Sequence, residues 1–261
     1  MKEIKYLITI CLIAFISISG YSQSLDPVKN NSYKCGEKLK FRVHYGLIDA
    51  GEATLEIKPS LEKIGPRDCY HIVGLGHSFG AFNWFFKVED RYESFLDSEA
   101  ITPWLFIRRV SEGGYKINQN YSFNPYKKTV STGTETKDVP SGIQDLLSAF
   151  YLARTMNFSD LKEGDVLYVN VFLDDNLYPM GIKYMGKEQI DTKLGKFNCL
   201  KFQPQLQKGR IFKDQEGMTM WISDDLNHIP IRLESDLLIG SIKIDLSDYS
   251  GLKNILNKIT E

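Results

Sequence analysis

Aromatic and basic side chains gather in one part of the sequence, where together they could bind a ligand. Five aromatic residues lie within eight positions: Phe79, Phe82, Trp84, Phe85 and Phe86. From this stretch and its continuation we take six candidate ligand-binding residues: Trp84, Phe86, Arg91, Trp104, Arg108 and Tyr115. Trp and Tyr rings beside arginine can stack on sugar rings or line an apolar pocket with a few polar anchors. The pattern predicts an apolar or a glycan ligand; the alternative is that the large aromatics are core residues.

The tripeptide Trp84-Phe85-Phe86 bears on whether the aromatic residues bind a ligand or belong to the core, because it overlaps a predicted strand over residues 85–95. Successive side chains of a strand point to opposite faces, so the tripeptide would place aromatic rings on both. Either both faces of this strand are covered, or one of them is a binding surface.

The sequence offers little support for catalysis by a serine nucleophile. Such a hydrolase needs a histidine base that a third group holds in place. The chain has only four histidines, His44, His71, His77 and His228, and nothing in the sequence places one of them beside a serine. We therefore lean toward a protein that is not an enzyme.

A glycan hydrolase is the enzyme class that the sequence excludes least, because it needs only two suitably placed carboxylates among 33 acidic residues. Those carboxylates lie about 5–9.5 Å apart in known mechanisms. Glu89 and Glu93 share one face of the predicted strand, but about 13 Å apart. The spacing counts against this pair, and an envelope glycan hydrolase remains the alternative.

No motif in the sequence predicts a metal ion or a cofactor. His71 and His77 would lie about 20 Å apart on an unbroken strand, too far to share one ion. The segments 174–176 and 224–227 are rich in Asp and Asn but lack the spacing of a calcium loop, so we interpret them as hairpin turns. Gly74 and Gly76 lie between predicted strands, where glycine relieves crowding or allows a bend, rather than before a helix that could bind phosphate.

The N-terminus has the order of a secretory signal peptide. Lys2 and Lys5 precede the apolar run 6–18, and small residues at Gly20 and Ser22 precede a cut after Ser22. The run is too short for a comfortable membrane span, although an uncleaved anchor or a buried helix is the alternative. Cys11 lies in the middle of the run, so we expect no lipid attachment. The prediction is an exported, periplasmic protein with no membrane span after cleavage.

Charge and cysteine content narrow the remaining classes. The formal net charge is −1, which gives no general attraction to nucleic acid. After cleavage Cys35, Cys69 and Cys199 remain. An odd number in an exported protein leaves at least one thiol unpaired inside the chain. One internal disulfide could form by three pairings, and the sequence does not choose between them.

Alternating apolar and polar residues predict a mainly β protein. Leu39 to Tyr45 alternates with the two-residue period of a half-buried strand. Further strands are predicted over 53–57, 69–75, 85–95, 104–110, 115–123, 128–131, 166–173, 180–190, 197–204, 218–222, 229–235 and 240–246. Many short strands with turns between them favour an antiparallel barrel or half-barrel. A division near Pro140 into two β halves is the alternative.

One amphipathic helix is predicted to pack on the sheet. Ser141 and Gln144 have the spacing of a capping box, and the helix would end near Asn157. Its apolar stripe has helical spacing: Ile143, Leu146, Leu147, Phe150 and Tyr151. Asp145 and Arg154 are predicted on the opposite face. The domain plan is a signal peptide over 1–22, a flexible lead over 23–34, a single β domain over 35–250 and a C-terminal tail over 251–261.

The order of short motifs along the chain resembles the DUF3108 family of bacterial exported proteins, in its Bacteroidetes branch. The resemblance covers roughly 33–246. Its motifs are Gly36 to Leu39, Val43 to Gly46, Ala50 to Ala53, Trp84 to Val88, Asp90 to Ser94, Pro103-Trp104, Arg108-Arg109, Glu112 to Tyr115, Asp145 to Tyr151, Leu194 to Phe197, and Trp221 to Asp225 before Ile229-Pro230. The resemblance implies an exported β-rich protein of unknown function, and it supplies no catalytic residues.

These observations favour a non-catalytic binding or carrier module for an apolar or glycan ligand in the cell envelope. Expected partners are a lipid, a glycan or an envelope protein, and no nucleic acid. A third hypothesis is an assembly factor that recognises another envelope protein through an exposed strand edge.

Overall fold

The computed structural model describes residues 24–259, apart from 47, 85, 206–216 and 237–240. The predicted signal peptide, residues 1–22, lies outside the described residues. Within the described part, no helix is both long and apolar enough to cross a membrane.

The described strands form one 16-stranded antiparallel sheet. In chain order they are β1 (Lys38–Tyr45), β2 (Ile48–Ile57), β3 (Glu62–Ile64), β4 (Arg67–Ser78), β5 (Glu89–Asp97), β6 (Pro103–Glu112), β7 (Tyr115–Asn124), β8 (Thr129–Ser131), β9 (Thr136–Asp138), β10 (Val166–Leu173), β11 (Asn176–Thr192), β12 (Gly195–Gln205), β13 (Met218–Ser223), β14 (Pro230–Asp236), β15 (Ser241–Ser250) and β16 (Lys258–Ile259). Across the sheet the order is β10-β11-β12-β13-β14-β15-β1-β2-β4-β5-β6-β7-β8-β9, with β3 beside β4 and β16 beside β12.

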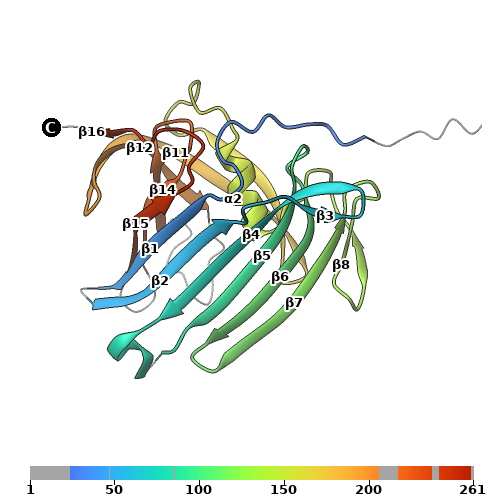
Figure 1. Cartoon of the computed structure of the whole chain (residues 1–261), viewed down its shortest axis with the longest axis horizontal. Coiled ribbons are helices and arrows are strands. Elements are labelled where there is room, and N and C mark those ends of the chain that lie inside the picture. The colour runs from blue at the N-terminus through green and yellow to red at the C-terminus, as the bar shows by residue number, and fades with distance from the viewer. Residues whose placement is uncertain (1–23, 47, 85, 206–216, 237–240, 260–261) are drawn as a thin grey trace, which may run out of the picture.

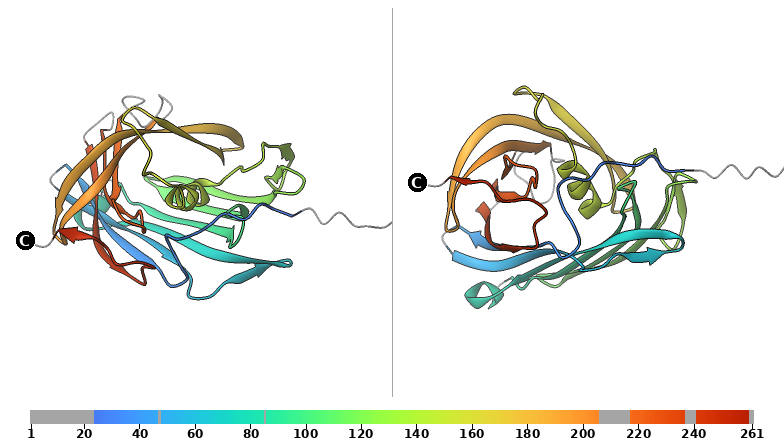
Figure 2. Two further views of the ribbon diagram at one scale, coloured as in Figure 1. Left: turned by 90° about the horizontal axis from the view of Figure 1, so that it is seen from above. Right: turned by 45° about the horizontal axis from the view of Figure 1, so that its top comes forward.

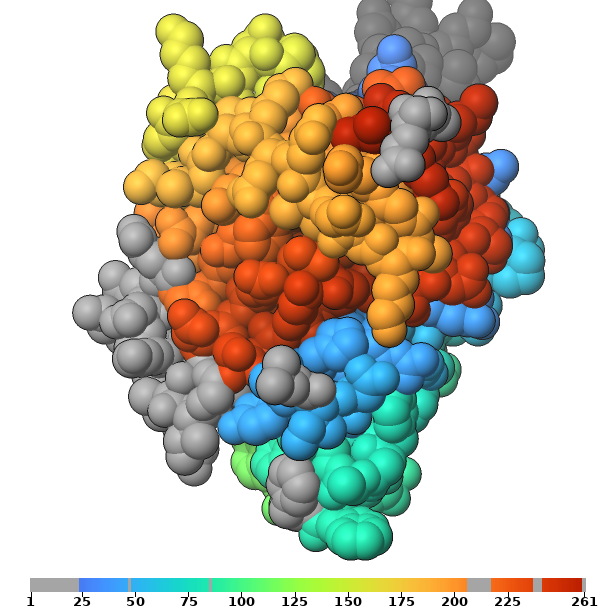
Figure 3. Space-filling view, turned by 90° about the vertical axis from the view of Figure 1, so that its left-hand side faces the viewer, coloured from blue at the N-terminus to red at the C-terminus, as the bar shows by residue number. Residues whose placement is uncertain are grey.

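The sheet is a half-barrel that curves around the helix α2 (Leu146–Arg154), as Figures 1 and 2 show. The end strands of the order, β9 and β10, are not paired with each other, so the sheet is not closed. The pairing of β15 with β1 joins the second half of the chain to the first in one sheet. The predicted fold class, a mainly β antiparallel half-barrel with one helix packed on the sheet, is confirmed. Figure 3 shows this junction from outside the half-barrel, where residues of β13 to β15 (orange to red) lie beside those of β1 and β2 (blue).

One predicted strand begins too early. The segment after β4 forms a 3₁₀ helix, η1 (Gly80–Trp84), and β5 begins only at Glu89. Ser78 and Val88 close this excursion, because Ser78 N donates to Val88 O at 3.1 Å and Val88 N donates to Ser78 Oγ at 2.7 Å. Gly80 starts η1 with a φ of 62°, which favours glycine. Trp84 and Phe86 therefore do not lie in a strand.

The helix also begins later than the sequence predicts. Gln144 is held in extended form beside β10, because its N donates to Asn170 O and its O accepts from Phe172 N. Asp145 is the N-cap instead of Ser141: its Oδ1 accepts from Leu147 N and Ser148 N, both at 2.8 Å. The carboxylate is fully buried, and burial raises its pKa to about 6 against hydrogen bonds that lower it. The prediction that Asp145 lies within the helix, on the face opposite the apolar stripe, is wrong.

The main core lies between α2 and the sheet. Leu147 and Tyr151 of the helix pack against Ile72 of β4, Leu96 of β5 and Phe106 of β6. The apolar residues on one face of the helix, three or four positions apart, contact alternate residues of the strands, which share the inner face of the sheet. This predicted stripe is confirmed as core.

Arg154, predicted on the face opposite the apolar stripe, is buried in a polar cluster that we call the upper hub: Ser32, Glu37, Arg154, Asn227 and the half-buried His228. Arg154 Nη1 and Nη2 donate to the Glu37 carboxylate at 2.6 and 2.9 Å, and its Nε donates to Asn227 O at 3.0 Å. Burial opposes the charge on Arg154, but Glu37 outweighs it and raises the pKa of the guanidinium. The segments before β1 and between β13 and β14 are thereby fixed to the end of the helix.

The ends of the described chain pack onto the domain. Ser32 Oγ donates to Arg154 O at 2.6 Å, and Tyr33 is fully buried, so residues 32–34 are not the flexible lead that the sequence predicts. In the predicted tail, Leu256 joins a core cluster with residues of β1 and β12 to β15, and β16 pairs with β12. An aromatic residue in a polar segment, Tyr33, was the signal for this packing.

Candidate functional site

Three of the six predicted ligand-binding residues lie at one end of the sheet, where β4 leads into η1 and β6 turns into β7 (the lower end in Figure 1). Trp84 ends η1 and is 90% exposed, whereas Tyr115 begins β7 and is 58% exposed. The Phe86 ring covers Gly113, where an added Cβ would lie 2.5 Å from Cε2 of the ring. Glycine is therefore required at this turn, both for the space and for its φ of 53°.

Two other predicted residues lie away from this end. Trp104 is near the start of β6, and its Nε1 donates to Asp97 Oδ2 at 3.0 Å. Arg91 lies on the face of β5 opposite to Tyr92, which packs against the core under α2. Its Nε donates to Glu93 Oε1 at 2.7 Å.

Arg108 lies on the same side of the sheet as α2 and bridges distant strands. Its Nη1 donates to Asp174 Oδ1 at 2.7 Å and to Gln119 Oε1 at 3.3 Å, and its Cζ lies 5.8 Å from the centre of the Tyr92 ring. Asp174 is in the turn between β10 and β11, so this contact ties β6 to the other end of the strand order. The six predicted residues therefore do not form one cluster, and Arg108 forms an ion pair between β6 and the turn that follows β10.

A largely apolar cavity lies below α2, and we call it the lower cavity. Its volume is about 450 Å³. It is lined by residues of β15, β1, β2 and β4, of the segment that contains η1, and of the end of β6: Val43, Tyr45, Ala50, Gly51, Glu52, Ala53, Gly76, His77, Ser78, Phe82, Phe86, Val88, Glu112 and Ile242. Of the predicted residues, the cavity lining includes Phe86 alone.

Glycine in β4 provides the space for this cavity. An added Cβ at Gly74 would meet side chains of Leu55, Leu147 and Tyr92 at 3.4–3.7 Å, so Gly74 faces α2. Gly76 lies two residues further on the same face, and an added Cβ would meet only Asp90 Cβ, at 3.8 Å. The sequence carried this signal in the alternate glycines of a strand, which we interpreted as relief of crowding rather than as the wall of a cavity.

A pair of carboxyl groups stands at the edge of the lower cavity. Glu112 lines it, and Asp90 is the cross-strand neighbour of Gly76. Asp90 Oδ1 accepts from Ser111 N at 3.0 Å. The pKa of Glu112 is raised to about 7, first by burial and then by the hydrogen bond to Asp90 and its negative charge, while Arg108 lowers it. At pH 7 the Glu112 carboxyl is therefore protonated about half of the time.

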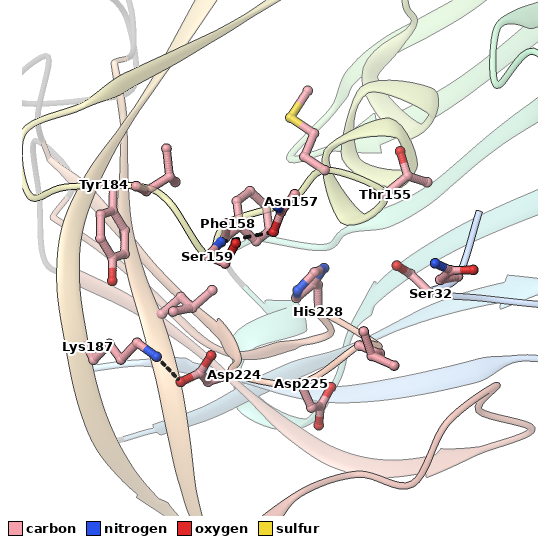
Figure 4. A pocket seen from close by; sticks show the side chains of 15 residues that line it. Ser32, Thr155, Asn157, Phe158, Ser159, Tyr184, Lys187, Asp224, Asp225 and His228 are labelled. Carbon is pink, nitrogen blue, oxygen red and sulfur yellow. Dashed lines mark hydrogen bonds and ion pairs between the residues drawn. The ribbon is translucent and has the colours of Figure 1, made fainter. Parts of the chain in front are cut away.

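A second, more polar pocket of about 560 Å³ lies beside the upper hub, and Figure 4 shows its side chains. Many of its polar groups are bonded to the protein itself. Lys187 Nζ donates to Asp224 Oδ2 at 2.7 Å, Asp225 Oδ2 accepts from a backbone N–H at 3.0 Å, and His228 Nδ1 lies 2.8 Å from Arg154 O. Because these side chains already bond to other groups of the protein, fewer polar groups are free to bind a ligand in this pocket. We therefore take the lower cavity as the candidate site.

Comparisons with known proteins identify a family but no biochemical activity. The family model described as "Protein of unknown function (DUF3108)" matches residues 40–247. The chain belongs to the DUF3108 family. No curated protein matches it.

The fold of the DUF3108 chain is similar to that of solved structures. A β-barrel-like protein of the DUF1849 domain family from Brucella abortus has a TM-score of 0.53 at 9% identity, over 87% of this chain and 98% of that one. A candidate lipoprotein from Parabacteroides distasonis has a TM-score of 0.39 at 11% identity, over 87% and 100%. A candidate exported protein with a YmcC-like fold from Bacteroides fragilis has 0.33 at 12%, over 86% and 99%. The first of these shows that the half-barrel is a shared fold.

The serine motifs of the DUF3108 chain lack the geometry of a hydrolase. The segment Gly76-His77-Ser78-Phe79-Gly80 does match G-x-S-x-G, which normally places serine at a strand-to-helix turn with a histidine base. Here Ser78 Oγ bonds to Asn83 and to Val88 N instead. The S-x-x-K spacings at 60–63, 159–162 and 250–253 lie outside the described helices, although the motif needs a helical turn to bring lysine to serine.

Both members of the alternative acid pair, Glu89 and Glu93, are bonded to other side chains. Glu89 is paired with Lys87 at 2.8 Å, and Glu93 accepts from Arg91 and lies 2.7 Å from His71 Nε2. Burial opposes ionisation of Glu93, but the bonds from Arg91 and His71 outweigh it and lower its pKa. The described residues contain no group of three or more His, Cys, Asp or Glu that could hold a metal ion.

The three described cysteines are free thiols. Cys69 and Cys199 are buried, and burial raises the pKa of both thiols to about 12. Thiolates are scarce under such conditions, so both behave as small apolar residues. None of the three candidate disulfide pairings is present.

Proposed function

We propose that this protein is a non-catalytic binding module that holds an apolar ligand in the lower cavity. The observation that carries the proposal is a cavity of about 450 Å³, within the range of about 300–1,000 Å³ that ligand sites occupy. An apolar cavity of about 150 Å³ holds benzene, so this volume accommodates roughly 18 carbon atoms. A single alkyl or acyl chain is the ligand class of that size.

Export to the periplasm completes the proposal. The order of basic, apolar and small residues over 1–22 supports cleavage after Ser22, and residues 23–261 would then form one exported domain. An exported protein with an apolar cavity suits the aqueous space between two membranes, where a free alkyl chain is poorly solvated. The resemblance to the Bacteroidetes branch of the family supports the same location.

A fluorescent apolar probe, N-phenyl-1-naphthylamine, tests the proposal. Gly76→Phe should fill the cavity, because Gly76 has an ordinary backbone conformation and open space before it. We expect probe affinity to fall at least about tenfold, which corresponds to the loss of roughly 1.4 kcal/mol.

Leu75→Phe is the matched control, since it adds the same ring to β4 on the opposite face, where Leu75 is 39% exposed. Circular dichroism checks that both variants fold. If Gly76→Phe binds the probe as tightly as the wild type, the lower cavity is not the binding site.

A further inference from the structure

The lower cavity has a distinctive charge content in addition to its apolar lining. The described lining residues include Glu52, His77 and Glu112 but no lysine or arginine. Glu52 and His77 are cross-strand neighbours next to Ala53 and Gly76, so their side chains point to the opposite face of the sheet. Glu112 is therefore the acidic side chain of the cavity itself. Such a lining does not suit an anionic head group, because a buried anion needs a cation or several hydrogen-bond donors.

The two acidic residues of the lining differ in their partners. Glu52 forms an ion pair with Arg42 at 3.1 Å, and His77 Nε2 lies 3.9 Å from its other oxygen. In contrast, neither Glu112 nor Asp90 forms an ion pair within the described part of the chain. The nearby cation, Arg108, is already in an ion pair with Asp174 at 2.7 Å.

We propose that the ligand of the lower cavity is a single-chain amphiphile with a primary amino head group, and that Glu112 and Asp90 bind its ammonium. This inference rests on the proposed function and names its substrate class. The cavity defines the site, and the carboxyl pair decides which head group it accepts.

The chemistry of the pair favours an ammonium over other head groups. An ammonium has three donors on one compact charge and can bridge two carboxylates. Without a ligand, two facing carboxyl groups avoid repulsion by retaining a proton, in line with the raised pKa of Glu112. A bound ammonium would replace that proton, so binding should release about half a proton at pH 7, where Glu112 is about half protonated. A carboxylate head group would instead add a third negative charge.

Displacement of N-phenyl-1-naphthylamine by three matched amphiphiles tests the inference at pH 7: dodecylamine, 1-dodecanol and dodecanoic acid, each below its micelle concentration. For the wild type we expect dodecylamine to bind at least about tenfold more tightly than dodecanoic acid, with dodecanol between them. Calorimetry in two buffers of different ionisation enthalpy should report the released proton for dodecylamine alone.

Variants assign the effect to the carboxyl pair. Glu112→Gln and Asp90→Asn should each weaken dodecylamine binding about tenfold and leave dodecanol unchanged, and both should abolish proton release. Glu89→Gln is the control, because Glu89 is exposed and paired with Lys87 outside the cavity.

The outcomes separate the two proposals. Equal affinity for the three amphiphiles, or tighter binding of dodecanoic acid, overturns the head-group inference while the apolar cavity stands as a binding site. Failure of every amphiphile and of the probe to bind overturns the proposed function itself.

Discussion

The two ends of the space around α2 are built in opposite ways. At the upper hub, the helix end meets large side chains and charges with partners: Arg154 and Glu37 are 1% and 0% exposed and bind each other through two hydrogen bonds. At the lower cavity, small residues such as Gly76 and Ala53 leave space, and the carboxyl pair has no cation partner among the described residues. One sheet thus carries an end where the buried charges are bonded to each other and an end where an apolar cavity adjoins a carboxyl pair without a cation partner.

Breaking the hub should have the largest effect. Glu37→Gln leaves the Arg154 guanidinium buried without its counter-charge, which typically costs about 3–5 kcal/mol in the free energy of unfolding. Urea denaturation measures the loss. Lys38→Gln is the matched control, because the Lys38–Glu56 pair at 3.7 Å lies at the surface and is partly exposed, so that it should contribute about 0–1 kcal/mol. Equal losses in the two variants would show that the hub is not the stabilising end.

The carboxyl pair should make the other end sensitive to pH. Glu112 has a pKa raised from 4.5 to about 7 in the folded protein, so the folded state retains a proton that the unfolded state releases. Its stabilising contribution is therefore complete below pH 4.5 and is lost as the pH rises through about 7. Urea denaturation at pH 4.5 and at pH 7 measures the change. Between these pH values the free energy of unfolding should decrease less for Glu112→Gln than for the wild type.

The buried Asp145 of the helix N-cap should change stability in the same direction, since its pKa is raised to about 6. That contribution is common to the wild type and to Glu112→Gln, so the difference between them isolates Glu112. Identical pH profiles for the two proteins would contradict the raised pKa of Glu112.

Sequence patterns predicted the parts of the molecule that depend on local periodicity. The strand over 166–173 has the bounds that alternation indicates, and the turn at 174–176 joins β10 to β11. The helical stripe with Leu147 and Tyr151 packs in the core. Each of these features follows from side chains that are close in sequence, which is why a single chain was enough to predict them.

The parts that depend on distant contacts were not predicted. Arg154 was placed on the face opposite the apolar stripe because a helical wheel cannot show Glu37, which comes from a segment 117 residues away. Asp145 was misplaced because Gln144 is held extended by β10. The aromatic cluster misled in a different way: it identified Phe86, but the space beside it is made by glycines, whose contribution is the absence of a side chain.

The smallest expected effects come from Phe86 and Trp84, which distinguish binding in the lower cavity from binding at the exposed aromatic residues. Phe86 lines the lower cavity, whereas Trp84 is 90% exposed and is not among the lining residues. Phe86→Ala should weaken binding of N-phenyl-1-naphthylamine by several-fold, because it removes apolar contact area worth about 25 cal/mol per Å². Trp84→Ala should leave both affinity and stability nearly unchanged, within about 0.5 kcal/mol. If Trp84→Ala has the larger effect on affinity, ligand binds at the exposed aromatic surface, and the aromatic cluster rather than the glycine-lined cavity is the functional end of the sheet.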